Sequence, residues 1–126
     1  MRAENDKLGQ VQLPDDALYG IQSARAKENF ALDYKRTDWH LIYAMVTVKK
    51  AAACVYQKLG VGKDGVYRAV EKACDLVLTG QADDAFVVDA LQGGAGTSTN
   101  MNVNEVLANL ALKLSGKQPG DYDSIH

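Results

Sequence analysis

The sequence predicts an all-α fold of about five helices with a short extended N-terminal arm or hairpin. Apolar residues recur at helical spacing in several segments, and glycine residues end or separate those segments. Strand-like alternation is confined to residues 6–14, a stretch too short to build a sheet domain. The chain has 126 residues, of which 47% are hydrophobic, so we expect one domain with one core.

The N-terminal arm leads into a first helix. In the arm, Val11 and Leu13 alternate with polar residues, which predicts an extended segment or a hairpin that packs against another element. Asp15 or Asp16 is the expected cap of the first helix. Gly20 lies within that helix and lowers its intrinsic stability, so tertiary contacts must support it.

The second helix is the longest and is predicted to open at Thr37 and to stop near Gly60. Its apolar residues occupy more than one face, which indicates a central helix packed on several sides. Lys49 and Lys50 interrupt any membrane-spanning interpretation. Because adjacent lysines point in different directions on a helix, we expect both to be solvated.

Two further helices follow, one predicted to begin near Asp64 and end at Gly80, the other to span residues 82–90. Asp89, near the end of the latter, has the chemistry of a general base. No residue near it in sequence would raise its pKa, so we expect a solvated aspartate at a helix end.

The fifth helix is preceded by a glycine-rich loop, and together they span residues 91–114. Gly93, Gly94 and Gly96 allow positive φ and leave backbone N–H groups free to face a ligand. A helix N-terminus carries about half a positive charge, so the loop suits an anion. An ordinary capped turn would explain the same residues. The helix has one predicted buried face, formed by Val103, Val106, Leu107, Leu110 and Leu114.

Composition narrows the class of partner. Fourteen basic and sixteen acidic residues leave a net charge of -2, so nucleic acid is not expected as a partner. Cys54 and Cys74 lack the spacing of a zinc or redox site and are expected to be small core residues. The first ten residues are charged, and no apolar run is long enough to cross a membrane. We therefore expect a reduced, cytoplasmic setting.

Three strings carry a resemblance to a known family. GGAGTSTNMNVNEV, starting at Gly93, resembles the signature of the aspartase/fumarase superfamily, whose members eliminate ammonia or water from a dicarboxylate to leave fumarate. LYGIQSARAKENF, starting at Leu18, resembles the N-terminal segment of that family, and VKKAAA, starting at Val48, also fits. The resemblance implies the N-terminal domain, supplied alone, of a longer lyase. It also implies that residues 116–126 begin an extended connection to a central helical domain.

The resemblance further implies roles for residues in the signature. In the family, fixed donors bind the aci-carboxylate dianion that forms when a base removes a proton next to a substrate carboxylate. Thr97 matches one of those donors, and Ser98 and Asn100 fall on the same signature as helpers in binding the substrate. The catalytic base of the family is a serine on a mobile loop, and no catalytic residue is expected in these 126 residues. The family assembles as homotetramers.

Arg25 and His126 are second-tier candidates. Arg25 has the bidentate donors that suit a substrate carboxylate, but a brace between Arg25 and Glu28 or the neighbouring structure explains it as well. His126 resembles a fumarase histidine that contributes to an accessory anion site. With few clustered carboxylates, we expect no metal site, and the resemblance implies no cofactor.

Within the family, Ala95 matches the aspartase pattern, whereas fumarases have serine there. The leading expectation is therefore the branch that eliminates ammonia from L-aspartate. The class II fumarate hydratase branch, which acts on malate, is the alternative. A second alternative is a non-catalytic module that uses the glycine-rich loop to bind a carboxylate or to support assembly.

Overall fold

The computed structural model describes residues 1–32, 35–63 and 65–126. It contains a two-stranded antiparallel hairpin, β1 (Arg2–Asp6) and β2 (Gly9–Leu13), with Arg2 opposite Leu13. Four α-helices lie within the described residues: α1 (Ile21–Asn29), α2 (Trp39–Lys58), α3 (Val66–Leu78) and α4 (Thr97–Leu114). The predicted all-α fold with an N-terminal hairpin is confirmed, with one α-helix fewer than about five.

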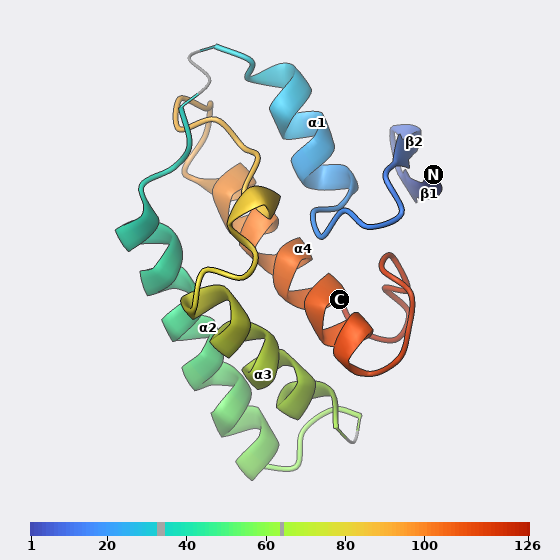
Figure 1. Ribbon diagram of the computed structural model, residues 1–126, viewed down its shortest axis with the longest axis vertical. Coiled ribbons are helices and arrows are strands. Elements are labelled where there is room, and N and C mark those ends of the chain that lie inside the picture. The colour runs from blue at the N-terminus through green and yellow to red at the C-terminus, as the bar shows by residue number, and fades with distance from the viewer. Residues whose placement is uncertain (33–34, 64) are drawn as a thin grey trace.

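α4 is the central helix of the fold (Figure 1). It contacts α1, α2 and α3, and α3 also packs along α2. Val103, Val106 and Ala111 of α4 are fully buried, as are Ala73 and Val77 of α3. The apolar face predicted for α4 is confirmed for its first four members, whereas Leu114 at the helix end is 48% exposed.

α2 is less buried than predicted. Ile42, Val46 and Ala53 pack into the core, but Val48 and Leu59 on other faces are each 69% exposed. The expectation that α2 packs on several sides is wrong, because α3 and α4 both lie against the same side of it. The helix begins after Asp38, whose side chain accepts a hydrogen bond from the N–H of His40 at 2.8 Å. This interaction makes Asp38 the N-cap, one residue after Thr37, where the helix is predicted to open.

The predicted helix over residues 82–90 is also wrong. Only one 3₁₀ turn forms there, η1 (Asp83–Ala85). The amide of Asn102 on α4 replaces the missing helical hydrogen bonds, because it donates to the carbonyl of Ala85 at 2.9 Å and accepts from the N–H of Val87 at 2.9 Å. A buried side chain from a neighbouring helix therefore holds this backbone in an irregular path.

α1 begins at a different residue from the predicted one, and the predicted start of α3 cannot be compared with the structure. α1 starts at Ile21 rather than at the Asp15 or Asp16 cap, and Asp15 instead binds the N-terminal ammonium group at 2.7 Å. The expected start of the third helix at Asp64 lies outside the described residues. α3 is described from Val66, and its end at Leu78 agrees with the stop predicted at Gly80.

The C-terminal residues fold back onto the domain (Figure 1). The N–H of Gly120 donates to the side chain of Asn109 at 2.8 Å, and Ile125 is only 4% exposed within the core. Residues 116–126 therefore follow turns packed against the core rather than an extended path. That they begin a connection to a central helical domain stays a prediction.

Candidate functional site

The glycine-rich loop turns directly into the N-terminus of α4. Gly94 and Gly96 have φ values of 93° and 81°, and Gly96 is the N-cap residue. A residue with a Cβ atom would be strained in this left-handed region. The N-cap residue Gly96 has no side chain to cap the helix, and no acidic residue lies in its first turn. Across the described residues, the N–H groups of Thr97 and Ser98 have no acceptor, so the positive helix end is left for an external anion.

The three predicted substrate-binding residues all lie in the first turn of α4. The side chain of Thr97 is exposed, and those of Ser98 and Asn100 are partly exposed. Thr97 and Asn100 are three residues apart, so they lie on the same side of the helix. The hydroxyl groups of Thr97 and Ser98 have no hydrogen-bond partner in the described part of the chain. The fold thus brings two hydroxyl groups, an amide and free backbone donors to one exposed helix end.

Thr99, between Ser98 and Asn100, has a structural role instead. Thr99 is buried, and its hydroxyl accepts a hydrogen bond from the Gln92 amide at 2.8 Å. The carbonyl oxygen of the same amide accepts from the N–H of Thr99 at 3.1 Å, and its nitrogen also donates to the carbonyl of Asp89 at 2.8 Å. Gln92 therefore ties both ends of the glycine-rich loop together. Sequence reasoning missed this residue because a single glutamine in a loop carries no pattern.

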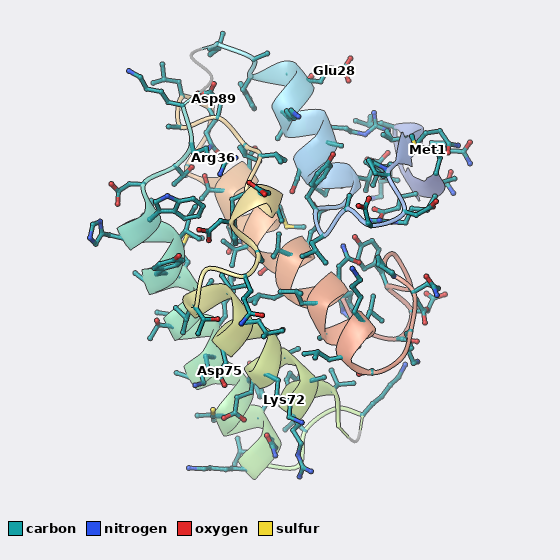
Figure 2. All side chains as sticks on the ribbon, in the orientation of Figure 1. Met1, Glu28, Arg36, Lys72, Asp75 and Asp89 are labelled. Carbon is teal, nitrogen blue, oxygen red and sulfur yellow. The ribbon has the colours of Figure 1, made fainter. Side chains whose placement is uncertain are left out.

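Asp89 is buried beside this loop. It is 7% exposed and accepts a hydrogen bond from the N–H of Leu91 at 2.8 Å, and its backbone forms an isolated bridge with Arg36 (Figure 2). The expectation of a solvated helix-end aspartate is wrong, because no α-helix forms over residues 82–90 and the chain pairs with the segment before α2. Asp89 is a structural residue of the loop.

Glu105 anchors the N-terminus of α1 to α4. Its buried carboxylate accepts from the backbone N–H groups of Gly20, Gln22 and Ser23 at 2.8–3.0 Å, and from the Ser23 hydroxyl. An anion at this position complements the helix dipole. Gly20 is required here, because a Cβ atom would collide with the Tyr122 hydroxyl and the Glu105 carboxylate. A glutamate on the buried face of α4 is the sequence signal that predicts such a partner.

Arg25 lies away from the glycine-rich loop. Its guanidinium group binds both carboxylate oxygens of Asp6 on β1, at 2.8 and 2.9 Å, and donates to the carbonyl of Gly9 at 3.1 Å. This pairing lowers the pKa of Asp6 and raises the pKa of Arg25. Glu28 lies on the outer side of α1 (Figure 2). Arg25 therefore braces the hairpin, with Asp6 rather than Glu28 as its partner.

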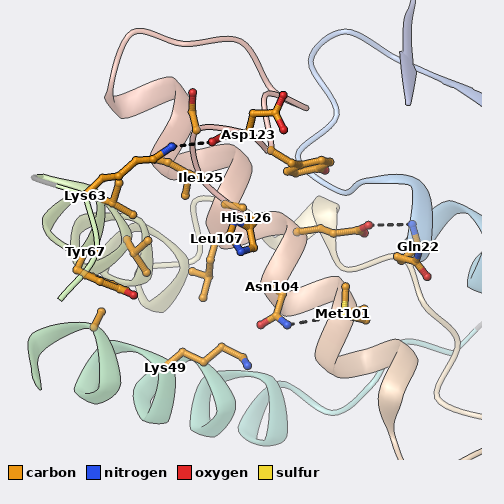
Figure 3. A pocket seen from close by; sticks show the side chains of 18 of the residues that line it. Gln22, Lys49, Lys63, Tyr67, Met101, Asn104, Leu107, Asp123, Ile125 and His126 are labelled. Atoms are coloured by element: carbon orange, nitrogen blue, oxygen red, sulfur yellow. Dashed lines mark hydrogen bonds between the residues drawn. The ribbon is translucent and has the colours of Figure 1, made fainter. Parts of the chain in front are cut away.

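His126 borders a separate cavity of about 750 Å³ between α2, α3, α4 and the C-terminal residues (Figure 3). Lys49 and Asn104 also line it. Thr97, Ser98 and Asn100 do not line this cavity. The fold thus places the second-tier residue His126 apart from the three first-turn residues, although Lys49 connects the two regions.

Lys49 is a cation beside the first turn of α4 whose contact with it sequence reasoning missed. Its ammonium group donates a hydrogen bond to Oδ1 of Asn100 at 2.8 Å. Partial burial lowers the pKa of Lys49. The expectation that Lys49 is solvated is wrong, because α2 packs against α4 and directs this side chain into the interface. Lys50 points elsewhere and pairs with Asp75 at 2.6 Å.

The residues that the structure describes contain no group of three or more histidine, cysteine, aspartate or glutamate side chains placed to hold a metal ion. No helix among them is both long and apolar enough to cross a membrane.

Comparison with known proteins gives consistent matches. A family model described as lyase matches residues 9–126. Aspartate ammonia-lyase from Helicobacter pylori strain J99 is 45% identical over 128 aligned residues, which cover 100% of this chain and 27% of that protein. Fumarate hydratase class II 1 from Pseudomonas aeruginosa is 44% identical over 125 residues, which cover 99% of this chain and 27% of that protein.

A solved structure shares the fold. The native crystal structure of a fumarate lyase:delta crystallin from Brucella melitensis superimposes with a TM-score of 0.94 at 47% sequence identity, covering 100% of this chain and 29% of that one. The chain thus spans between a quarter and a third of the length of these relatives.

Proposed function

The chain belongs to the lyase family, and we propose that it is the N-terminal domain of an aspartate ammonia-lyase, which eliminates ammonia from L-aspartate to give fumarate. In this proposal the domain supplies part of the carboxylate-binding site, and residues 1–126 form one structural unit of the longer enzyme. The aspartate ammonia-lyases among its relatives support this assignment.

The observation that carries the proposal is the N-terminus of α4, where the N–H groups of Thr97 and Ser98 have no acceptor in the described chain. Backbone N–H groups, the Thr97 hydroxyl and the absence of any first-turn carboxylate leave fixed donors facing outward. Such donors bind negative charge without reorganising, so they stabilise a transition state in which a carboxylate gains charge. We assign Thr97 as the principal donor, with Ser98 and Asn100 as helpers through side chains or backbone amides.

The catalytic base is proposed to come from the part of the enzyme beyond these residues, as the resemblance to the superfamily implies. In the described chain the hydroxyl groups of Thr97 and Ser98 are not hydrogen-bonded to a base, and the Asn100 side chain is bonded to the Lys49 ammonium group. We therefore expect residues 1–126 alone to have no turnover. We also propose that the intact enzyme is a cytoplasmic homotetramer whose sites combine segments from several subunits.

A class II fumarate hydratase is the second candidate. It is supported by the 44% identity to the Pseudomonas aeruginosa enzyme, which equals the identity to two of the aspartate ammonia-lyases. Ala95 favours the aspartase assignment. The resemblance implies a serine at this position in fumarases, and Ala95 lacks that hydroxyl group.

The deciding experiment is an assay of the full-length protein with L-aspartate and, separately, with L-malate, following fumarate absorbance. We expect fumarate from aspartate and none above background from malate. Fumarate from malate alone would replace the aspartase assignment with the fumarase one. Turnover of either substrate by the isolated 126-residue chain would contradict the proposal that the base lies outside it.

A further inference from the structure

Lys49 occupies an unusual position for a lysine on a surface helix. It projects from α2 toward α4 at the edge of the cavity (Figure 3), and the only hydrogen bond of its side chain in the described part of the protein is to Asn100. No carboxylate of the described residues lies within ion-pair distance of it. The neighbouring Lys50, by contrast, is neutralised by Asp75. The fold thus places an uncompensated positive charge beside the first turn of α4.

The contact also determines how the Asn100 amide is oriented. An ammonium group has only donors, so the group that faces it must be the amide oxygen. The amide nitrogen is then turned to the other side, where it has no acceptor in the described part of the chain. An asparagine without this lysine would be free to present either end.

We propose that Lys49 is a positioning residue of the carboxylate-binding site, an inference that rests on the proposed function. Lys49 holds the Asn100 amide with its N–H donors facing the ligand, and its charge adds to the positive potential at the N-terminus of α4. It acts on the substrate carboxylate through Asn100 and through its field, without touching the reacting atoms.

The test uses the full-length enzyme and fumarate formation from L-aspartate. We expect Lys49→Met, which keeps the length of the side chain but removes its charge, to lower kcat/KM roughly 10- to 100-fold, the range for losing a charged hydrogen bond. Lys49→Arg, which retains donors and charge, should recover part of that loss. The matched control is Lys50→Met on the same helix, for which we expect kcat/KM within about twofold of the wild type.

Two further variants separate positioning from support of the fold. Asn100→Asp retains an acceptor for Lys49 but loses the amide donors, so we expect kcat/KM to fall at least as far as for Lys49→Met with the melting temperature preserved. In the Lys49→Met and Asn100→Ala double variant the combined loss should be less than the sum of the two single losses, because both changes remove the same oriented donor.

Three outcomes would overturn the proposal: equal kinetics for Lys49→Met and Lys50→Met, wild-type kcat/KM in Asn100→Asp, or additive losses in the double variant. If Lys49→Met does not fold, the kcat/KM of Asn100→Asp decides whether the proposal stands. Wild-type activity on malate instead of aspartate would refute the assigned substrate but not Lys49, and the same variants would then be measured with malate.

Discussion

Two threonines in the first turn of α4 show how residue type alone does not determine a role. Thr97 is exposed with an unpaired hydroxyl, whereas Thr99 is buried and bonded to Gln92. The Thr97 hydroxyl makes no hydrogen bond in the described chain, so its removal should change function without changing stability. Thr99, in contrast, holds the glycine-rich loop in place.

The first prediction concerns Thr97→Ala in the full-length enzyme. We expect kcat/KM for L-aspartate to fall roughly 10²- to 10³-fold, as is typical when one fixed donor to a developing negative charge is removed. The melting temperature should not change, because the hydroxyl has no partner in the described chain. Thr47→Ala on α2, where the hydroxyl bonds only to the Tyr43 carbonyl, is the control. Unchanged kinetics in Thr97→Ala would remove Thr97 from the site.

At the scale of the element, α1 is a helix that its own sequence does not stabilise. It is nine residues long, it has no side-chain N-cap, and Gly20 precedes it. Two buried carboxylates replace the cap: Glu105 accepts from the N–H groups of Gly20, Gln22 and Ser23, and Glu4 accepts from the N–H of Ile21 at 2.9 Å. The helix therefore depends on the arrangement of α4 and β1.

Glu105→Gln tests this dependence. The amide keeps the size of the side chain but loses the charge and one acceptor oxygen, so some backbone N–H groups at the start of α1 stay unpaired. We expect the free energy of unfolding to fall by about 1–3 kcal/mol, measured by urea denaturation. Glu28→Gln at the exposed end of α1 should change it by less than about 0.5 kcal/mol. Equal effects of the two substitutions would contradict the anchoring role.

The ion pair between the hairpin and α1 predicts a pH dependence. Hydrogen bonding to Arg25 lowers the pKa of Asp6 below its ordinary value of 3.8. A carboxyl group whose pKa is lower in the folded state stabilises the fold above its unfolded pKa, and that contribution disappears as the pH falls through the folded pKa. We expect Asp6→Asn to lower stability near neutral pH and to weaken the loss of stability below about pH 4.

The measurement for this prediction is the urea midpoint of the wild type and of Asp6→Asn between about pH 2 and pH 7. Asp16→Asn is the control, because exposed Asp16 has no ion pair in the described chain. Parallel pH profiles for the wild type and Asp6→Asn would show that the Asp6–Arg25 pair contributes nothing to acid stability.

At the scale of the whole molecule, α3 and α4 carry the core, and α2 covers it from one side only. Cys74 lies at the centre of this core with no exposed surface, whereas Cys54 on α2 is partly exposed. Of the two predicted core cysteines, Cys74 is confirmed and Cys54 is not fully buried. Burial raises the pKa of Cys74 to about 11, so little thiolate forms while the protein is folded.

Cys74 therefore reports on global unfolding. With iodoacetamide at neutral pH, we expect Cys54 to be alkylated first and Cys74 only at the rate at which the core opens, as read by mass spectrometry of the 126-residue chain. Destabilising changes such as Glu105→Gln should accelerate labelling of Cys74 more than that of Cys54. Labelling of both thiols at the same rate in the native protein would contradict the packing of α3 described here.

The correct predictions and the errors have different physical origins. The helices α2, α3 and α4 and the stop at Gly80 follow from local periodicity and glycine conformation, which a sequence displays directly. Residues 82–90 have helical spacing, but the Asn102 amide offers their backbone better partners across the fold. Asp89 and Lys49 were misjudged for a similar reason, since their burial depends on elements distant in the chain.

By itself, the sequence determined the class of fold, the family and the glycine-rich loop that opens α4, because these depend on residues close together in the chain. Only the tertiary structure decided which polar groups stay unpaired and which are used inside the fold. Thr97 and Thr99, or Lys49 and Lys50, are indistinguishable by local pattern. Their partners come from other elements, and the free energy of a buried or unpaired polar group depends on those partners.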